Sequence, residues 1–228
     1  MIRVGDIEVQ VVRKDIKNLY LRVYPPHGRI RVSVPLHVTD EHVRLAVAAR
    51  LKWIRKQQSR FLLQPGQSRR KMLSGESHYV FGRPYLLDVV ERRGRHEVLV
   101  KDNAILSLYV SPDTTLGNRK RVLDEWYRDL MKERIHALLA KWQPITGKEV
   151  AEWGVKRMKT RWGSCNITRR RIWLNLELAK QPVECLEYVL VHEMVHLYER
   201  YHNDNFKRYM DKFMPQWRLH RETLNQAP

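Results

Sequence analysis

The first third of the chain alternates apolar and polar positions and then changes to a helical period. Residues 19–23 and 30–34 both alternate, and a Pro-Pro-His-Gly segment between them is typical of a turn. Residues 1–38 are therefore predicted to contain a β-hairpin. From about residue 40 to residue 62 the apolar positions follow a 3.6-residue period, so one helix is predicted there, with Thr39 near its start.

The middle of the chain repeats this order of strands and then a helix. Residues 64–77 are polar, basic and glycine-bearing, which indicates a loop, and residues 78–110 return to strand patterning. A wide apolar face predicts a helix over about residues 119–143, which Pro144 and Gly147 close.

The last third is predicted to be a mixture of strands and helices. Residues 161–165 and 171–178 are expected to be two strands joined by a turn, with Asn175 among the outward polar positions of the second. One helix is expected to open after Pro182 and another near Asn205.

These elements predict an α+β fold without evident internal repeats. We expect a β-rich N-terminal region with one helix over residues 1–115. An α+β C-terminal domain that carries the chemistry is expected over residues 116–228.

Length and composition narrow the class of protein. The chain has 228 residues, 43% of them hydrophobic, which is enough for a sizeable core. It has no apolar run of about 18 residues and no signal-peptide pattern, so we expect a cytoplasmic protein without membrane contact. The two cysteines, Cys165 and Cys185, exclude a disulfide framework and a structural zinc site made of four cysteines.

The charge is strongly positive. There are 43 Lys and Arg residues against 25 Asp and Glu, a net charge of +18. The first 100 residues hold 20 basic and 9 acidic residues, and the remaining residues hold the rest of the excess. The positive charge is therefore spread over the chain and is not a basic tail. A spread excess favours nucleic acid, nucleotide or acidic peptide partners, but it also fits a basic surface without a partner, since no nucleic-acid recognition motif accompanies it.

The candidate chemistry centres on the sequence His-Glu-Met-Val-His. His192 and His196 are four residues apart and lie on the same face of a helix, where both can bind one metal ion. Glu193 lies about a quarter turn away and can act on a water molecule without being a ligand. A bound zinc ion lowers the pKa of water, and the glutamate then accepts the proton as general base.

The sequence around this motif favours a metal over the alternative of hydrogen-bonded core histidines. The helix is apolar almost all round, so it is expected to lie in the core. Two histidines and a glutamate are costly inside a core unless a metal or hydrogen bonds satisfy them.

A catalytic zinc usually has three protein ligands, and His202 is the best candidate for the third. It follows His196 by six residues, as in the longer zincin pattern, but Glu199 replaces the glycine of that pattern. Glu199 itself, Asp204 and His220 are the alternative third ligands.

The segment from Met158 to Phe213 resembles the YgjP-like metallopeptidase family. The resemblance rests on the sequence from Lys159 to Cys165, the strand Ile172–Leu178, the helix Tyr188–His196 and the sequence from His202 to Phe206. It implies a zincin-type domain similar to minimal gluzincin-like peptidases.

The same resemblance implies the roles of individual residues. His192, His196 and His202 become the ligands of Zn²⁺ and Glu193 the general base of a zinc metallopeptidase acting on a peptide or protein. Some family members carry a nucleotide (UTP) pyrophosphatase label, which is one alternative function. A nucleic-acid-associated protein or protease is another, given the basic charge.

Several neighbouring residues keep two interpretations. Residues 171–178, or the strand beside them, are expected to pair with an extended substrate, or else form an ordinary central strand. Gly163 allows a close backbone approach or a bulge. Cys165 is either an inert thiol or a thiolate that switches the metal off. The candidates for stabilising the oxyanion are Arg161, Tyr198, Tyr201 and Tyr209.

Overall fold

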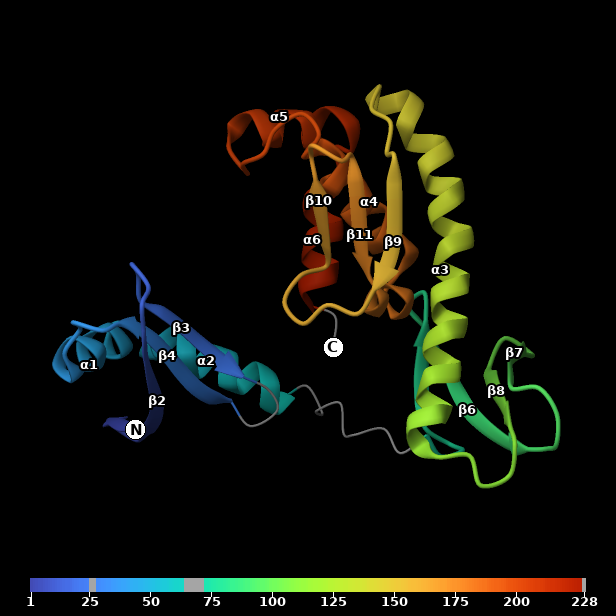
Figure 1. The fold of residues 1–228 in the computed structure, drawn as a ribbon, viewed down its shortest axis with the longest axis horizontal. Coiled ribbons are helices and arrows are strands. Elements are labelled where there is room, and N and C mark those ends of the chain that lie inside the picture. Colours follow the sequence, from blue (N-terminus) through green and yellow to red (C-terminus); the bar gives the residue numbers. More distant parts are fainter. Residues whose placement is uncertain (25–27, 64–71, 227–228) are drawn as a thin grey trace. The chain divides into compact units, whose positions relative to one another are not determined.

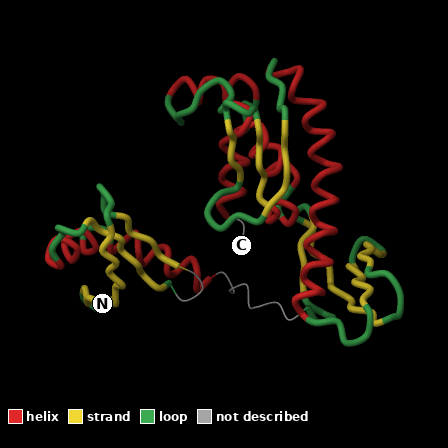
Figure 2. Tube along the Cα trace, viewed as in Figure 1, coloured by secondary structure: helices red, strands yellow, loops and turns green. Residues whose placement is uncertain are grey.

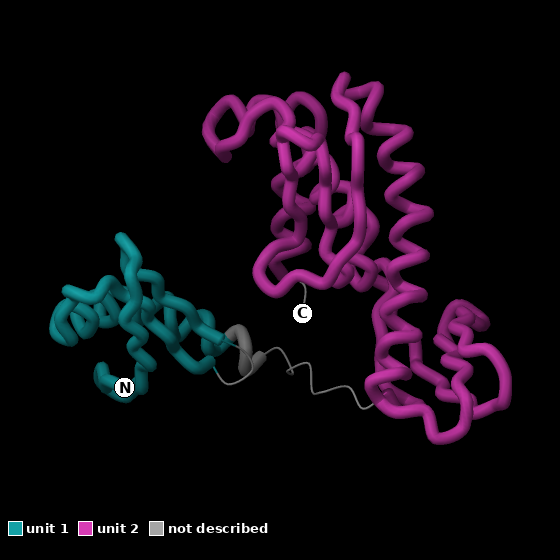
Figure 3. The backbone as a smooth tube through the Cα atoms, viewed as in Figure 1, with its two compact units in different colours: residues 1–70, 228 teal, residues 71–227 magenta. Residues whose placement is uncertain are grey.

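The computed structural model describes residues 1–24, 28–63 and 72–226, with the side chains of residues 60–63 left out. The chain divides into two compact units, Met1–Arg70 and Lys71–Ala227 (Figure 3). The expected α+β class is confirmed, whereas the division at residue 70 differs from the boundary expected at residue 115.

Unit 1 begins with a four-stranded sheet. Its strands are β1 (Ile2–Val4), β2 (Ile7–Lys14), β3 (Tyr20–Tyr24) and β4 (Arg29–Pro35), in the order β1-β2-β4-β3. The predicted hairpin is confirmed as the antiparallel pair of β3 and β4, while β2 and β4 run parallel. The turn of that hairpin lies partly outside the described residues.

Two helices follow where one was predicted. They are α1 (Asp40–Ala48) and α2 (Leu51–Leu63), and Thr39 caps α1 by accepting a hydrogen bond from the backbone of His42. The break occurs because the Arg50 N–H bonds to the Val47 carbonyl, which tightens the turn between the helices. Both helices contribute to the core of the unit through Val43, Val47 and Ile54, which are fully buried.

The second unit opens with a sheet of the same topology. Its strands are β5 (Ser77–Val80), β6 (Arg83–Glu91), β7 (Glu97–Lys101) and β8 (Ile105–Val110), in the order β5-β6-β8-β7. The directions also match, since the first and last pairs are antiparallel and the central pair is parallel. The chain thus contains a structural repeat that its sequence does not reveal. The loop predicted over 64–77 is partly outside the described residues, and its last residue begins β5.

Helix α3 (Leu116–Thr146) follows the second sheet, just as α1 follows the first, and Thr115 caps it. The helix continues through Pro144 instead of ending there. A proline in the last turn removes only one backbone hydrogen bond, and the helix tolerates this loss so close to its end. Gly147 ends it in the left-handed conformation, with φ of 66°. Neither α3 nor any other helix in the described ranges is both long and apolar enough to cross a membrane.

The rest of unit 2 is a three-stranded sheet with helices packed on it (Figures 1 and 2). The strands are β9 (Glu152–Lys156), β10 (Gly163–Asn166) and β11 (Arg171–Asn175), in the order β10-β11-β9. After the 3₁₀ helix η1 (Leu176–Lys180) come α4 (Val183–Val195), α5 (Asp204–Phe213) and α6 (Trp217–Gln226). Helix α4 contacts β10, β11, α5 and α6 and so lies at the centre of this region.

The sheet of β5 to β8 belongs to unit 2 because it shares that unit's core. The Tyr127 hydroxyl on α3 donates to the Tyr79 carbonyl on β5 at 2.7 Å. The backbone N–H of Phe81 bonds to the carbonyl of Ala179 in η1 at 2.8 Å. The N-terminal strands of this unit thus support the segment that leads directly into α4.

The strand predicted over 171–178 ends at Asn175. Its side chain was expected to face outward, but it is 5% exposed and caps η1 by accepting from the Glu177 N–H. It also donates to the carbonyls of Met158 and Arg161. Because this amide satisfies the backbone of two segments, it turns the chain out of the sheet.

Candidate active site

The site is built on the C-terminal end of α4. Nine residues of this helix are buried, as its sequence predicts, and His192 and Glu193 occupy its last turn. His196 is the C-cap residue, after which the N–H groups of Leu197 and Tyr198 still bond to carbonyls of that turn. The helix therefore ends so that both histidines stay close to the chain that follows.

A turn closed by a carboxylate brings the third histidine back. Glu199 accepts a hydrogen bond from the Tyr201 N–H at 3.0 Å. This bond, together with the side chains of Asn203 and Asn205, lowers the pKa of Glu199. Asn203 also accepts from the Phe206 N–H and so begins α5. Glu199 thus organises the turn in which the longer zincin pattern has a glycine.

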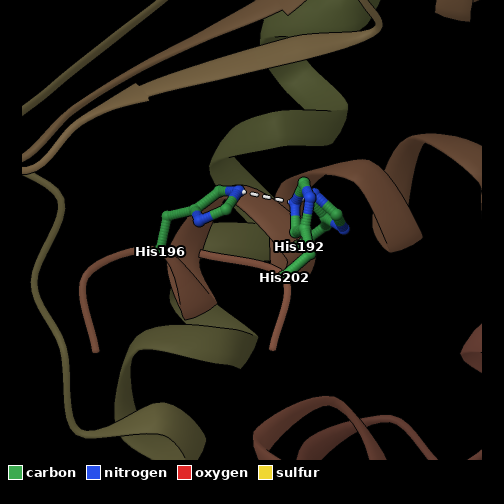
Figure 4. A group of neighbouring side chains, drawn as sticks. All are labelled: His192, His196 and His202. Carbon is green, nitrogen blue, oxygen red and sulfur yellow. Dashed lines mark hydrogen bonds between the residues drawn. The ribbon is translucent and has the colours of Figure 1, made fainter. Parts of the chain in front are cut away.

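The three predicted histidines converge on one point (Figure 4). The Nε2 atom of His202 lies 3.0 Å from Nε2 of His192 and 3.1 Å from Nε2 of His196. Four-coordinate zinc with bonds of about 2.0–2.1 Å keeps its nitrogen ligands about 3.3 Å apart, so the spacing fits one shared metal ion. Glu199, Asp204 and His220 do not belong to this cluster of described residues.

The hydrogen bonds of the rings also fit a metal. Nδ1 of His196 lies 3.0 Å from the Glu199 carbonyl, which can only accept, so Nδ1 carries the proton and Nε2 has a free lone pair. Three facing Nε2 atoms at this spacing cannot all be satisfied by the protons they hold, whereas a cation satisfies all three. Nδ1 of His192 is buried and has no hydrogen-bond partner among the described residues.

Phe206 holds the three rings together from one side. Its ring centroid lies 4.8 Å from that of His192, 4.9 Å from that of His196 and 4.7 Å from that of His202. From its spacing in the sequence, Phe206 is predicted only to be a core residue on a helix. Its position three residues after the Asn203 cap is the signal that it returns toward the histidines.

The protonation of the histidines suits metal binding. Burial, together with the neighbouring His196 and His202, lowers the pKa of His192 to about 3. Burial is also the main cause that lowers the pKa of His196. Both rings are therefore neutral near pH 7, which is the form that binds metals.

Glu193 is enclosed by α4 and β10. Its side chain is 6% exposed, and a Cβ atom on Gly163 would lie 2.6 Å from its Oε1. The close approach expected at Gly163 is therefore confirmed. Burial raises the pKa of Glu193 to about 8, against the opposing effect of the Arg161 guanidinium. A buried acid with a perturbed pKa beside a ligand cluster is typical of an active site.

An open cleft of about 830 Å³ contains this group. The edge strand β10 forms one wall, and the three histidines and Glu193 also line it. Three arginines, Arg161, Arg200 and Arg221, are in the lining as well, and none of them forms an ion pair with a described carboxylate. The cleft is thus electropositive, with Glu193 as its one acidic lining residue.

The structure separates the candidates for stabilising an oxyanion. Arg161 lines the cleft, held by a loop whose carbonyl accepts from Asn175. Tyr198 instead donates its hydroxyl to Thr146 and stacks on Tyr209, with ring centroids 4.6 Å apart. Tyr201 is 67% exposed, and none of the three tyrosines lines the cleft. A lining residue that the sequence did not indicate is Tyr188, whose ring packs edge-on against His192.

The structure also locates the strand that can pair with a substrate and the thiol of Cys165. The strand over 171–175 is central, and its neighbour β10 is the edge strand beside the cleft. Cys165 of β10 lines the cleft, and burial, with a smaller effect of Glu193, raises the pKa of its thiol to about 12. The thiol is therefore protonated at neutral pH.

Comparisons with known proteins show what the chain resembles. The family described as YgjP-like, metallopeptidase domain, has a model that matches residues 17–227, which include every residue that lines the cleft. No curated protein matches the chain. A similar solved structure is the metallopeptidase zymogen of Pyrococcus abyssi abylysin, at 23% identity and a TM-score of 0.36, over 40% of this chain and 90% of that chain.

Proposed function

Because the chain belongs to the YgjP-like metallopeptidase family, we propose that it is a zinc-dependent peptidase with His192, His196 and His202 as ligands and Glu193 as general base. The observation that carries the proposal is the convergence of three Nε2 atoms, with spacings of 3.0 and 3.1 Å, beside a buried carboxylate.

Zinc fits the ligand set better than magnesium or calcium. Three neutral imidazoles suit zinc, whereas the harder ions require carboxylate and carbonyl oxygens. The ion would act as a Lewis acid that polarises the substrate carbonyl and makes a water molecule a nucleophile near neutral pH.

Glu193 accepts the proton of the attacking water and passes it to the leaving amine. The carboxylate must be ionised for this, and a divalent cation at the histidines favours the ionised form. The contact with Gly163 restricts where the carboxylate can lie. Arg161 lines the same cleft and can stabilise the negative charge that develops on the carbonyl oxygen.

The edge strand β10 binds the substrate backbone. Its pairing with β11 leaves its other edge toward the cleft, where an extended peptide can add as a further strand. Backbone hydrogen bonds then hold the peptide in line with the histidines.

The test begins with metal content. Wild-type protein is expected to hold about one zinc per chain, and His202→Ala is expected to lose it, as a three-ligand site requires. An unstructured protein is then incubated with wild type and with Glu193→Gln. The proposal is supported if wild type cleaves the protein and Glu193→Gln, which retains its zinc, does not. It is contradicted if wild type contains no zinc after metal-controlled purification.

A nucleotide pyrophosphatase is the second candidate, since the unpaired arginines of the cleft also suit phosphates. UTP belongs in the same assay. This activity would be favoured over the peptidase if wild type turned over UTP but did not cleave the protein, and if Glu193→Gln lost the UTP turnover.

A further inference from the structure

A group of arginines and tyrosines lies on one face of the sheet in unit 1. In the register of β3 and β4, Tyr20, Arg22 and Tyr24 alternate with the partly buried Leu21 and Val23. Arg29 and Arg31 likewise alternate with buried valine and isoleucine on β4. These five residues, Tyr20, Arg22, Tyr24, Arg29 and Arg31, form the basic sheet face, opposite the face that packs on α1 and α2.

The arrangement of charges on this face is unfavourable for the protein alone. Arg22 lies directly opposite Arg31 across the two strands, and Arg29 lies opposite Tyr24. Like charges at directly opposed positions destabilise a sheet. None of the three arginines forms an ion pair with a carboxylate in the described part of the chain.

The aromatic rings lie among these charges. Tyr20 lies on the edge strand β3 and is 50% exposed. The Arg22 guanidinium, which bonds to the phenol of Tyr24, lowers the pKa of that tyrosine, and Arg31 adds to the effect. The Tyr24 phenol thus lies within hydrogen-bonding reach of two guanidinium groups.

The repeated sheet of unit 2 provides an internal comparison. Its equivalent outward positions on β7 and β8, read from the same strand pairing, include Glu97 and Lys101. That face therefore carries both signs of charge. The basic sheet face is a property of the first copy and does not follow from the topology.

The charge of unit 1 as a whole points the same way. Residues 1–70 contain 15 Lys and Arg and 5 Asp and Glu, so they hold more than half of the net charge of +18 in less than a third of the chain.

We infer that the basic sheet face binds single-stranded nucleic acid, with the arginines on backbone phosphates and Tyr20 and Tyr24 stacked on bases. Flat sheets that present rings among cations bind unpaired bases in this way, because every base offers a face for stacking. Arginines alone would suffice to bind an acidic protein or an anionic membrane surface, whereas tyrosines beside the arginines add the faces on which unpaired bases stack.

The experiment measures binding of the full chain to a fluorescein-labelled oligothymidylate of about 20 nucleotides by anisotropy over a range of salt concentrations. The double variant Arg22→Gln/Arg31→Gln is expected to reduce the slope of log Kd against log salt by about 1.4, as for two lost phosphate contacts on a single strand. Tyr20→Leu is expected to weaken binding about five-fold or more while leaving the salt slope unchanged.

A matched control separates this face from the total charge. Arg44→Gln/Lys52→Gln removes the same charge from exposed positions on α1 and α2 and is expected to change binding little. Removal of two opposed arginines relieves repulsion, so the double variant is expected to fold, and thermal unfolding checks this.

Three results would overturn the inference. They are no binding of the oligonucleotide at low salt, equal weakening by the control pair, and binding of a duplex as tight as that of the single strand. Binding to phosphatidylserine vesicles without binding to the oligonucleotide would likewise overturn it and assign the face to a membrane surface.

Discussion

The Cα atom of Gly163 lies directly against the Glu193 carboxylate, so that a Cβ atom there would come within 2.6 Å of Oε1 and 2.8 Å of Cγ. A side chain of any kind at residue 163 must therefore displace the glutamate. We expect Gly163→Ala to lower kcat by about 100-fold, as a misplacement of about 1 Å in a catalytic group can do. Zinc content is expected to stay at the wild-type level, because the three atoms nearest to a Cβ at this position all belong to Glu193.

Gly117→Ala is the control for this variant, since a Cβ atom there meets nothing within 4 Å. It is expected to retain full activity. If Gly163→Ala also kept full activity, the carboxylate would have another position from which it can act.

The pairing of His192 with His196 could be predicted from sequence because their spacing, four residues on one helix, is local. The position of His202 needed a turn that the sequence does not display. Its geometry depends on Glu199 accepting from Tyr201 and on Phe206 packing against three rings. Such contacts form only once α4 and α5 are in place.

Boundaries were less predictable for a related reason. Asn175 fits the period of a strand, but its buried side chain binds carbonyls of a segment that is about 14 residues earlier in the chain. Tertiary contacts of this kind override alternation. The repeat of the two sheets was hidden because topology is set by strand order and direction, and the side chains of the two copies have diverged in charge.

Glu199→Ala tests whether the turn positions His202, the proposed third ligand. Loss of the carboxylate removes the acceptor of the Tyr201 N–H and frees the backbone that carries His202. We expect zinc affinity to fall about 10- to 100-fold, as for other groups that orient ligands. Competition with a fluorescent chelator measures it. Glu133→Ala, at an exposed position of α3, is the control, and equal affinities in the two variants would contradict this role.

The raised pKa of Cys165 predicts a slow thiol. Its pKa is raised from 9.0 to about 12, so at pH 8 the thiolate is roughly a thousand-fold rarer than for an ordinary cysteine. Alkylation by iodoacetamide, followed by mass spectrometry, is expected to be correspondingly slow, and Cys165→Ser is expected to keep its activity. Rapid alkylation near neutral pH would instead favour a thiolate that regulates the metal.

The same shift has a consequence for stability at high pH. A group with a raised folded-state pKa stabilises the fold fully below its unfolded value, here about 9, and this contribution is lost as the pH rises toward about 12. Cys185, with a pKa raised to about 11 by burial, acts in the same direction. The midpoint of urea unfolding is therefore expected to fall between pH 9 and pH 11, and less so in Cys165→Ser.

Removal of the metal is expected to destabilise unit 2. Free metal at about 100 times its Kd stabilises the folded state by about 2.7 kcal/mol, so a chelator is expected to lower Tm by about 5–10 °C. Calorimetry with and without the chelator measures the change, and added zinc reverses it. His202→Ala serves as the control, because a chain without the site is expected to unfold at the same temperature in both conditions.

The unpaired arginines of the cleft predict a preference for acidic substrates. Arg161, Arg200 and Arg221 are exposed, line the cleft and have no carboxylate partner among the described residues. A carboxylate of the substrate near the scissile bond can pair with one of them, which lowers KM if the pair forms in the bound substrate.

Peptides that differ only by Glu or Gln at each position around the bond are therefore expected to differ in kcat/KM. The Glu peptides are expected to be cleaved faster, and salt is expected to reduce their advantage. Arg221→Gln removes the cation carried by α6, which bears neither Glu193 nor a histidine of the cluster, so it is expected to reduce this advantage and to leave cleavage of the Gln peptides unchanged. Equal loss on both sets would assign Arg221 to the structure of the cleft instead of to its selectivity.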